Sequence, residues 1–171
     1  AAGLTNRDQA KTFIYAFLYG AGPAKIGAIV GGGEREGKKL IDSFLANTPA
    51  LKTLRQKVDR LAKRGWLPSL DGRRLMVRSA HAALNVLLQG AGAVVMKQAL
   101  VLLHSKLNRV IMDASFVANV HDEWQIETNE KLAESVGQAG VQAIQEAGLT
   151  LGLRCPLDGE YKIGTNWATT H

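Results

Sequence analysis

RDQAKTFIYAFLYGAG, residues 7–22, places a cation or a phenol at every fourth position of an otherwise apolar segment. Thr5 or Asn6 can cap a helix here, and the glycines after Leu18 can end it. Side chains four positions apart drift by 40° around a helix, so four of them span about 120° of its circumference and roughly 18 Å of its length. The spacing therefore predicts a helix with one exposed stripe, made of Arg7, Lys11, Tyr15 and Tyr19.

The chemistry of this stripe suits a phosphorylated ligand with a ring. Cations near a helix N-terminus act together with the helix dipole on an anion. Phenols one and two turns further along can stack on a sugar and a base. A solvated basic face over packed aromatics is the alternative interpretation.

The whole chain has 171 residues, enough for one ordinary domain or two small lobes. Its 21 Lys and Arg residues outnumber 15 Asp and Glu residues, and the formal net charge of +6 favours a polyanionic partner. Cys155 is the only cysteine, which excludes an intrachain disulfide framework and favours an intracellular location.

No signal peptide or membrane span is expected. The longest apolar stretch, residues 83–103, is interrupted by amides and a lysine. This composition is more typical of a buried amphipathic helix than of a segment in lipid, so the sequence predicts no membrane partner.

The pattern of elements predicts an α+β fold. Helical periodicity dominates to about Lys63, and a hairpin signal follows around Asp71 and Gly72. A long helix is expected from about His81 to Leu107, and residues 109–128 read as two strands around a turn. An amphipathic helix then precedes residues 151–164, which read as a further strand, so helices are expected to pack on a small antiparallel sheet.

The long helix carries a second spaced set of polar groups: His81, Asn85 and Gln89. Amides on one helix face can donate to the purine N3 and pyrimidine O2 acceptors that every base pair presents in the minor groove. A polar seam satisfied inside the core is the ordinary alternative.

The turn between the two late strands reads Val120-His121-Asp122-Glu123. Adjacent carboxylates point to opposite faces of a straight strand, but a tight turn can bring both to one hard cation. Phosphoryl transfer with two metal ions needs such carboxylates, although a solvated acidic turn is the ordinary explanation for an isolated triplet.

Together these three sets resemble the family A DNA polymerases, the DNA polymerase I family, and most closely the replicative polymerases of short-tailed phages. R-x3-K-x3-Y-x3-YG is similar to their motif B on the fingers helix, and Val120–Glu123 is similar to motif C. His81, Asn85 and Gln89 are similar to the minor-groove helix of the phage members, while other members carry Arg first. The three motifs occur in the family order and cover nearly the whole chain.

The resemblance implies a helical fingers portion over residues 1–64 and a C-terminal palm portion over 65–171, with the minor-groove helix and the motif C hairpin. It implies that primer-template DNA and a dNTP are bound in a bacterial host cell's cytoplasm. Arg7 and Lys11 would bind the triphosphate, Tyr15 would face the sugar, and Tyr19 would stack near the templating base. Most bacterial members carry Phe in place of Tyr15, so weaker rejection of dideoxynucleotides is expected here.

The resemblance also implies a catalytic set. Asp122 would be a direct ligand of one of two Mg²⁺ ions, Glu123 an accessory carboxylate at the metals, and His121 a neighbour of the primer terminus. Lys11 would complete the set from the fingers helix.

One part of the family pattern is missing. Motif A, with its second metal-binding aspartate, lies upstream of motif B in the family and has no counterpart here; Asp113-Ala114-Ser115 lacks the following Glu and comes after motif B. The chain by itself is therefore expected not to extend primers, and its expected partner is the N-terminal part of the polymerase that carries motif A. The alternative is a DNA-binding relic or a split-polymerase subunit without chemistry of its own.

Two other classes of enzyme fit less well. A metal phosphohydrolase of the HD type needs further His and Asp ligands, and the other histidines show no such pattern. Residues 32–39 imitate the ATPase loop G-x4-G-K, but Lys39 stands where a hydroxyl must reach magnesium. Glycines that cap helices explain these residues better.

Overall fold

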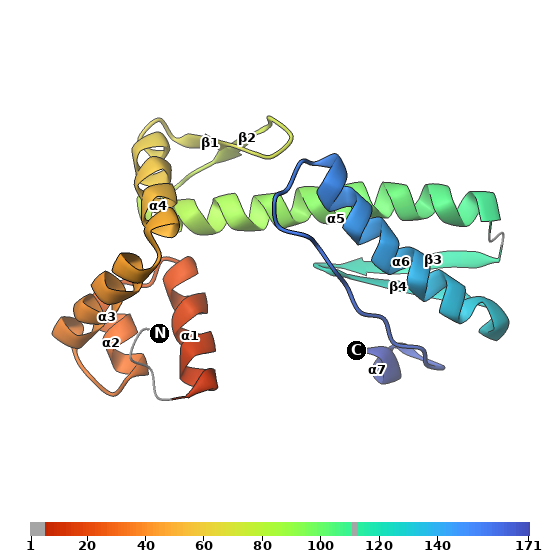
Figure 1. Ribbon diagram of the computed structural model, residues 1–171, viewed down its shortest axis with the longest axis horizontal. Coiled ribbons are helices and arrows are strands. Elements are labelled where there is room, and N and C mark those ends of the chain that lie inside the picture. The colour runs from red at the N-terminus through yellow and green to blue at the C-terminus, as the bar shows by residue number, and fades with distance from the viewer. Residues whose placement is uncertain (1–5, 111–112) are drawn as a thin grey trace. The chain divides into compact units, whose positions relative to one another are not determined.

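The computed structural model describes residues 6–110 and 113–171, without the side chains of 109 and 110. The chain divides into two compact units, Ala1–Gly90 and Ala91–His171, and helix α5 (Ala83–Val110) contributes to both (Figure 1). Residue 64, the expected end of the fingers portion, lies inside the first unit, after the fourth helix. The division into fingers and palm portions at that residue stays a prediction.

The first unit begins with helices whose ends follow local sequence signals. The Asn6 side chain caps the first helix by accepting from the Gln9 N–H at 2.8 Å, and prolines stand at the first positions of the second and fourth helices. The predicted helices are confirmed, with bounds α1 (Arg7–Leu18), α2 (Pro23–Ile29), α3 (Glu34–Asn47) and α4 (Pro49–Ala62).

These helices share one apolar core. Phe13 and Phe17 on α1 are almost fully buried, and both rings meet the edge of Phe44 on α3 at centroid distances of 5.1 and 5.3 Å. Edge-to-face aromatic pairs stabilise a core beyond the area they bury. The apolar side of α1 is therefore fixed, and its opposite side remains available to solvent.

Two glycines allow α2 and α3 to approach each other closely. A Cβ on Gly27 would lie 1.9 Å from the Gly33 carbonyl oxygen, and one on Gly37 would lie 1.8 Å from the Pro23 carbonyl oxygen. The Gly33 N–H donates to the Glu36 carboxylate at 3.0 Å, so the start of α3 is capped by its own side chain. Helix α2 precedes residues 32–39, whereas an ATPase loop needs a strand at that place. This order of elements supports the interpretation of the glycines in residues 32–39 as packing and capping residues.

The predicted hairpin joins β1 (Trp66–Pro68) to antiparallel β2 (Arg74–Met76). At its turn, the Asp71 carboxylate accepts from the Arg73 guanidinium at 2.5 Å. The Trp66 ring lies under the guanidinium of Arg64, at 3.5 Å from the ring centroid, with that of Arg74 at 4.7 Å. A 3-10 turn, η1 (Ala80–Ala82), then leads into α5.

The second unit contains a two-stranded antiparallel sheet, counted within the described residues: β3 (Ala114–Val120) and β4 (Glu123–Thr128). Apolar side chains of the sheet pack against a core formed by Leu103, Leu107, Val136 and Ala143 from α5 and α6 (Glu130–Thr150). Between these two helices, the Lys106 ammonium and the Glu146 carboxylate form an ion pair at 2.7 Å. The last described element is a short helix, α7 (Trp167–Thr170).

The segment after α6 differs from its prediction. Residues 151–164 contain neither helix nor strand, so the expected further strand is wrong. Apolar residues of this segment pack on α6 instead: Leu157 covers Gly148, and the Tyr161 ring covers Gly137. The Tyr161 hydroxyl also donates to the Glu134 carboxylate, and this bond raises the pKa of Tyr161.

One described helical span, 80–108, is long and apolar enough to cross a membrane, judged by length and composition. Its most apolar window has a mean hydropathy of 1.7, and 11% of that window is buried within the chain. The expectation of a largely buried helix is therefore not met. Val101 is 61% exposed on this helix, although Leu103 is fully buried in the second core.

Candidate functional site

The stripe on α1 lies on the solvent side of that helix, as its spacing predicts. Arg7 and Lys11 are exposed, and the rings of Tyr15 and Tyr19 are 51% and 54% exposed. The two rings stack on each other with centroids 6.4 Å apart. Because Phe13 on the opposite side is buried, the helix is anchored with its cations and phenols accessible.

The α1 stripe and the set formed by His81, Asn85 and Gln89 meet within the first unit. The Gln89 side-chain amide on α5 donates to the Tyr19 hydroxyl at 3.4 Å, a long contact at the edge of hydrogen-bonding range. Gly20 has φ of +81° and lies directly against the backbone of His81. The residues just after α1 thus contact both the 3-10 turn η1 and α5, with His81 exposed on η1 and Asn85 half-buried on α5.

The acidic turn is a two-residue loop that joins paired strand ends. Val120 pairs with Glu123, and His121 and Asp122 form the turn between them. His121 has φ of +54°, in the left-handed region that residues other than glycine seldom adopt. Strained residues of this kind gather at active sites, where the surrounding structure fixes a side chain in place.

Asp122 and Glu123 have different surroundings. Asp122 is exposed, and its carboxylate has no hydrogen-bond or ion-pair partner among the residues that the structure describes. Glu123 accepts hydrogen bonds from the Gln125 amide at 2.5 Å and the Trp167 indole at 2.9 Å, and its second oxygen lies 2.8 Å from His171 Nδ1. The bonds from Gln125 and then His171 lower the pKa of the Glu123 carboxyl and keep it ionised.

The turn fits half of a metal site. Carboxylate oxygens are the ligands that Mg²⁺ prefers, and Asp122 offers two that are not otherwise engaged within the described chain. No group of three or more His, Cys, Asp or Glu side chains within residues 6–110 and 113–171 is placed to hold a metal ion. A complete site therefore needs oxygen ligands from water, a bound phosphate or another segment.

The surroundings of Glu123 were not predicted from the sequence. Trp167 begins α7 and His171 follows its last residue, so both lie more than forty residues after Glu123. The available signal was Asn166, whose side chain caps α7 by accepting from the Thr169 N–H at 3.2 Å. The stripe on α1 belongs to the first unit and the acidic turn to the second, so their predicted approach to one nucleotide stays a prediction.

Comparison with known proteins identifies the class. The model of DNA polymerase family A matches residues 3–169, so this chain belongs to DNA polymerase family A. The fold agrees: the POL domain of Pol1 from M. smegmatis, solved in complex with DNA primer-template and dNTP, aligns with 82% of this chain and 27% of its own at a TM-score of 0.72 and 20% identity.

Among curated relatives, phage polymerases are prominent. The DNA-directed DNA polymerase of Escherichia phage T7 is 42% identical over the whole chain, and that of Escherichia phage Phieco32 is 41% identical over 99% of it. DNA polymerase I of Pseudomonas aeruginosa is 28% identical over 96%. The chain spans 27% and 29% of the two phage proteins' lengths, so it corresponds to about a quarter of such a polymerase.

Proposed function

We propose that this chain supplies the fingers and the C-terminal palm of a DNA-directed DNA polymerase, which transfers a nucleotide from a dNTP to a primer 3′-hydroxyl on a template during DNA replication. The observation that carries the proposal is the family match over residues 3–169, combined with phage polymerase relatives at 41–42% identity. The partners would be primer-template DNA and a dNTP in the cytoplasm of a bacterial host cell.

The α1 stripe would bind the incoming nucleotide. Arg7 and Lys11 would neutralise charge that builds up on the leaving pyrophosphate. Tyr15 would face the sugar and Tyr19 the templating base, and their exposure on the solvent side of α1 supports these roles. The Gln89 contact with Tyr19 supports a minor-groove role for the adjacent face formed by His81, Asn85 and Gln89.

The acidic turn would hold catalytic magnesium. Asp122 would be the direct ligand, with Glu123 beside it as the accessory carboxylate and His121 near the primer terminus. Bound Mg²⁺ ions would activate the primer oxygen and stabilise the transferring phosphate. The unengaged oxygens of Asp122 support this assignment.

The partner for catalysis would be a polymerase segment that carries motif A. The chain spans 27% and 29% of the lengths of its two phage relatives, and the rest of such an enzyme would supply this segment. Apolar side chains exposed on several elements also support a missing cover, since Met76 is 70% and Val117 is 65% exposed.

Primer extension tests the proposal. The 171-residue chain with Mg²⁺, dNTPs and a primed template should give no extension by itself. Adding the portion of the phage T7 relative that precedes the matched region should restore it. Extension by the chain without a partner would overturn the need for motif A.

A second candidate function is DNA binding without chemistry, which the net charge of +6 and the half metal site favour. It predicts that DNA binding persists while extension stays absent in every mixture with a motif A segment.

A further inference from the structure

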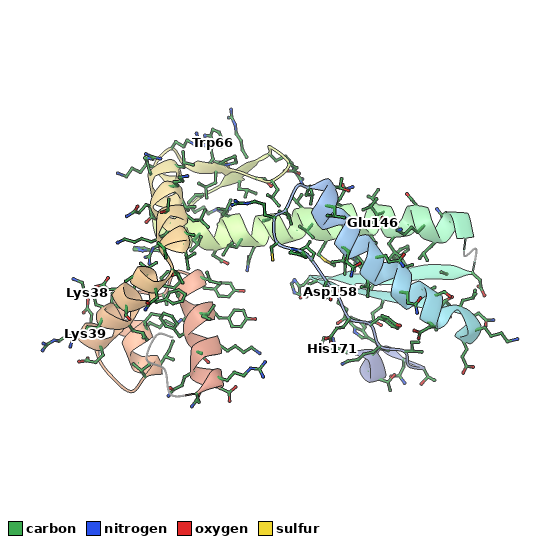
Figure 2. The ribbon with its side chains drawn as sticks, viewed as in Figure 1. Lys38, Lys39, Trp66, Glu146, Asp158 and His171 are labelled. Atoms are coloured by element: carbon green, nitrogen blue, oxygen red, sulfur yellow. The ribbon has the colours of Figure 1, made fainter. Side chains whose placement is uncertain are left out.

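The Glu123 carboxylate is the centre of a hydrogen-bonded group that joins the acidic turn to the end of the chain. Its Oε1 accepts from the Gln125 amide and from the Trp167 indole, and its Oε2 contacts the His171 imidazole. We call Gln125, Trp167, Thr170 and His171 the carboxylate clamp. Three of its four members come from the end of the chain, where Figure 2 labels His171.

The clamp restrains the carboxylate in both position and direction. An indole nitrogen can only donate, so the direction of the Trp167 bond is fixed. Gln125 is itself oriented from α7, because the Thr170 hydroxyl donates to its carbonyl oxygen at 3.1 Å. Bonds to a charged acceptor are shorter and stronger than neutral ones, and here they engage both oxygens of one carboxylate.

The neighbouring carboxylate has no such restraint. Asp122 is exposed and has no partner within the described residues, whereas Glu123 is half-buried with donors on both oxygens. The two adjacent carboxylates therefore differ in how many hydrogen bonds restrain them. A carboxylate held by three donors acts from a fixed position, and one without partners can close on a cation.

We propose that Trp167 and His171 are positioning residues of the acidic turn: α7 and the residue that follows it hold the Glu123 carboxylate in one orientation beside Asp122, and Asp122 is left as the carboxylate that closes on the divalent cation. The catalytic consequence rests on the proposed polymerase function. The clamp itself is a property of this chain and has its own readout.

The clamp is tested by NMR on the ¹⁵N-labelled 171-residue chain. The Trp167 indole N–H should resonate downfield because it donates to a carboxylate, and Glu123→Gln should move it upfield. Glu127→Gln, an exposed change on the same strand, is the matched control and should leave it in place. The backbone amide resonances of α6, in the same unit, report whether that unit remains folded.

If Glu123→Gln does not fold, Glu123→Asp keeps the charge and shortens the side chain, and the same upfield shift is expected. A Trp167 indole resonance that stays in place in both variants would overturn the proposal.

The different tasks of Asp122 and Glu123 are tested by Mn²⁺ titration, in which binding is followed by paramagnetic line broadening. Asp122→Asn should lower Mn²⁺ affinity at least tenfold, while Trp167→Phe should lower it less than threefold; the reverse order would overturn the division.

The catalytic consequence is measured in the complemented extension assay. Trp167→Phe should lower kcat about tenfold with little change in the KM for dNTP, and Trp167→His, which restores an N–H donor, should recover part of the loss. Unchanged kcat in an active mixture would reject the positioning role. A mixture that never extends primers would reject the proposed function. The NMR test of the clamp does not depend on that assay and would still decide whether the clamp exists.

Discussion

The backbone of His81 leaves no space for a side chain on Gly20: a Cβ there would lie 2.0 Å from the His81 carbonyl oxygen. This contact fixes the end of α1, with its stripe, against the start of the helix that carries Asn85 and Gln89. The geometry of the first unit therefore depends on a glycine that also has a φ of +81°.

Gly20→Ala should destabilise the first unit by about 2–4 kcal/mol, from the left-handed backbone and the overpacking together. Chemical denaturation of the full chain measures the change. Gly22→Ala is the control, since nothing lies within 4 Å of the Cβ it would add, and it should stay within about 0.5 kcal/mol of the parent. Equal effects of the two substitutions would contradict the contact.

His121→Val should destabilise the second unit by about 1–2 kcal/mol, because a β-branched residue is poorly suited to φ of +54°. His121→Asn should cost less than about 0.5 kcal/mol, since asparagine adopts this region readily. The free energies of unfolding of the two variants are compared by urea denaturation, with hydrogen exchange in β3 and β4 as the probe. An unchanged free energy of unfolding in His121→Val would show that the turn relaxes to an ordinary conformation.

The turn of the first hairpin should depend on pH. The Arg73 guanidinium lowers the pKa of the Asp71 carboxyl from 3.8 to about 2. The Asp71–Arg73 contribution is therefore fully present above about pH 4 and is lost as the pH falls toward 2. An NMR titration of the Asp71 side-chain carbon should give the low midpoint. Arg73→Ala should move it toward 3.8, and Arg74→Ala, the control on the adjacent residue, should not.

The local part of the fold was predictable from the sequence, and the distant part was not. The period of four in α1, the cap at Asn6 and the proline at the first position of α2 are encoded within a few residues, so α1 and α2 follow from pattern alone. Alternating apolar residues after α6 suggest a strand, but Leu157 and Tyr161 pack on helical glycines instead. Alternation reports burial on one side, and a helix surface satisfies it as well as a sheet does.

The same distinction applies to the candidate site. Val120–Glu123 is a contiguous motif, so the acidic turn was predicted to the residue. Besides Gln125, the partners of Glu123 lie 44 and 48 positions away, at the start of the four-residue helix α7 and just after it, and such a short helix has no period of its own. Contacts of this kind arise from tertiary folding and leave little trace in local sequence.

Tyr15→Phe should change how a complemented enzyme treats chain terminators. A phenol beside the sugar can replace the hydrogen bond that the missing 3′-hydroxyl of a dideoxynucleotide would make. Loss of the phenol hydroxyl in Tyr15→Phe should cost about 1.5 kcal/mol, which lowers dideoxynucleotide incorporation roughly tenfold. Competition between dNTP and dideoxynucleotide measures the ratio, with Tyr19→Phe as the control on the next turn. Equal discrimination by the parent and Tyr15→Phe would remove Tyr15 from the sugar site.

We propose that this chain supplies the nucleotide-binding helix and one metal-binding carboxylate of a polymerase. The most direct measurement compares parent and Asp122→Ala chains in the complemented primer-extension assay, with DNA binding followed in parallel by fluorescence anisotropy. We predict that Asp122→Ala lowers extension by about 10³-fold or more, since metal stabilisation of the transferring phosphate is worth several kcal/mol, while DNA affinity is preserved. Extension that survives Asp122→Ala would contradict the account.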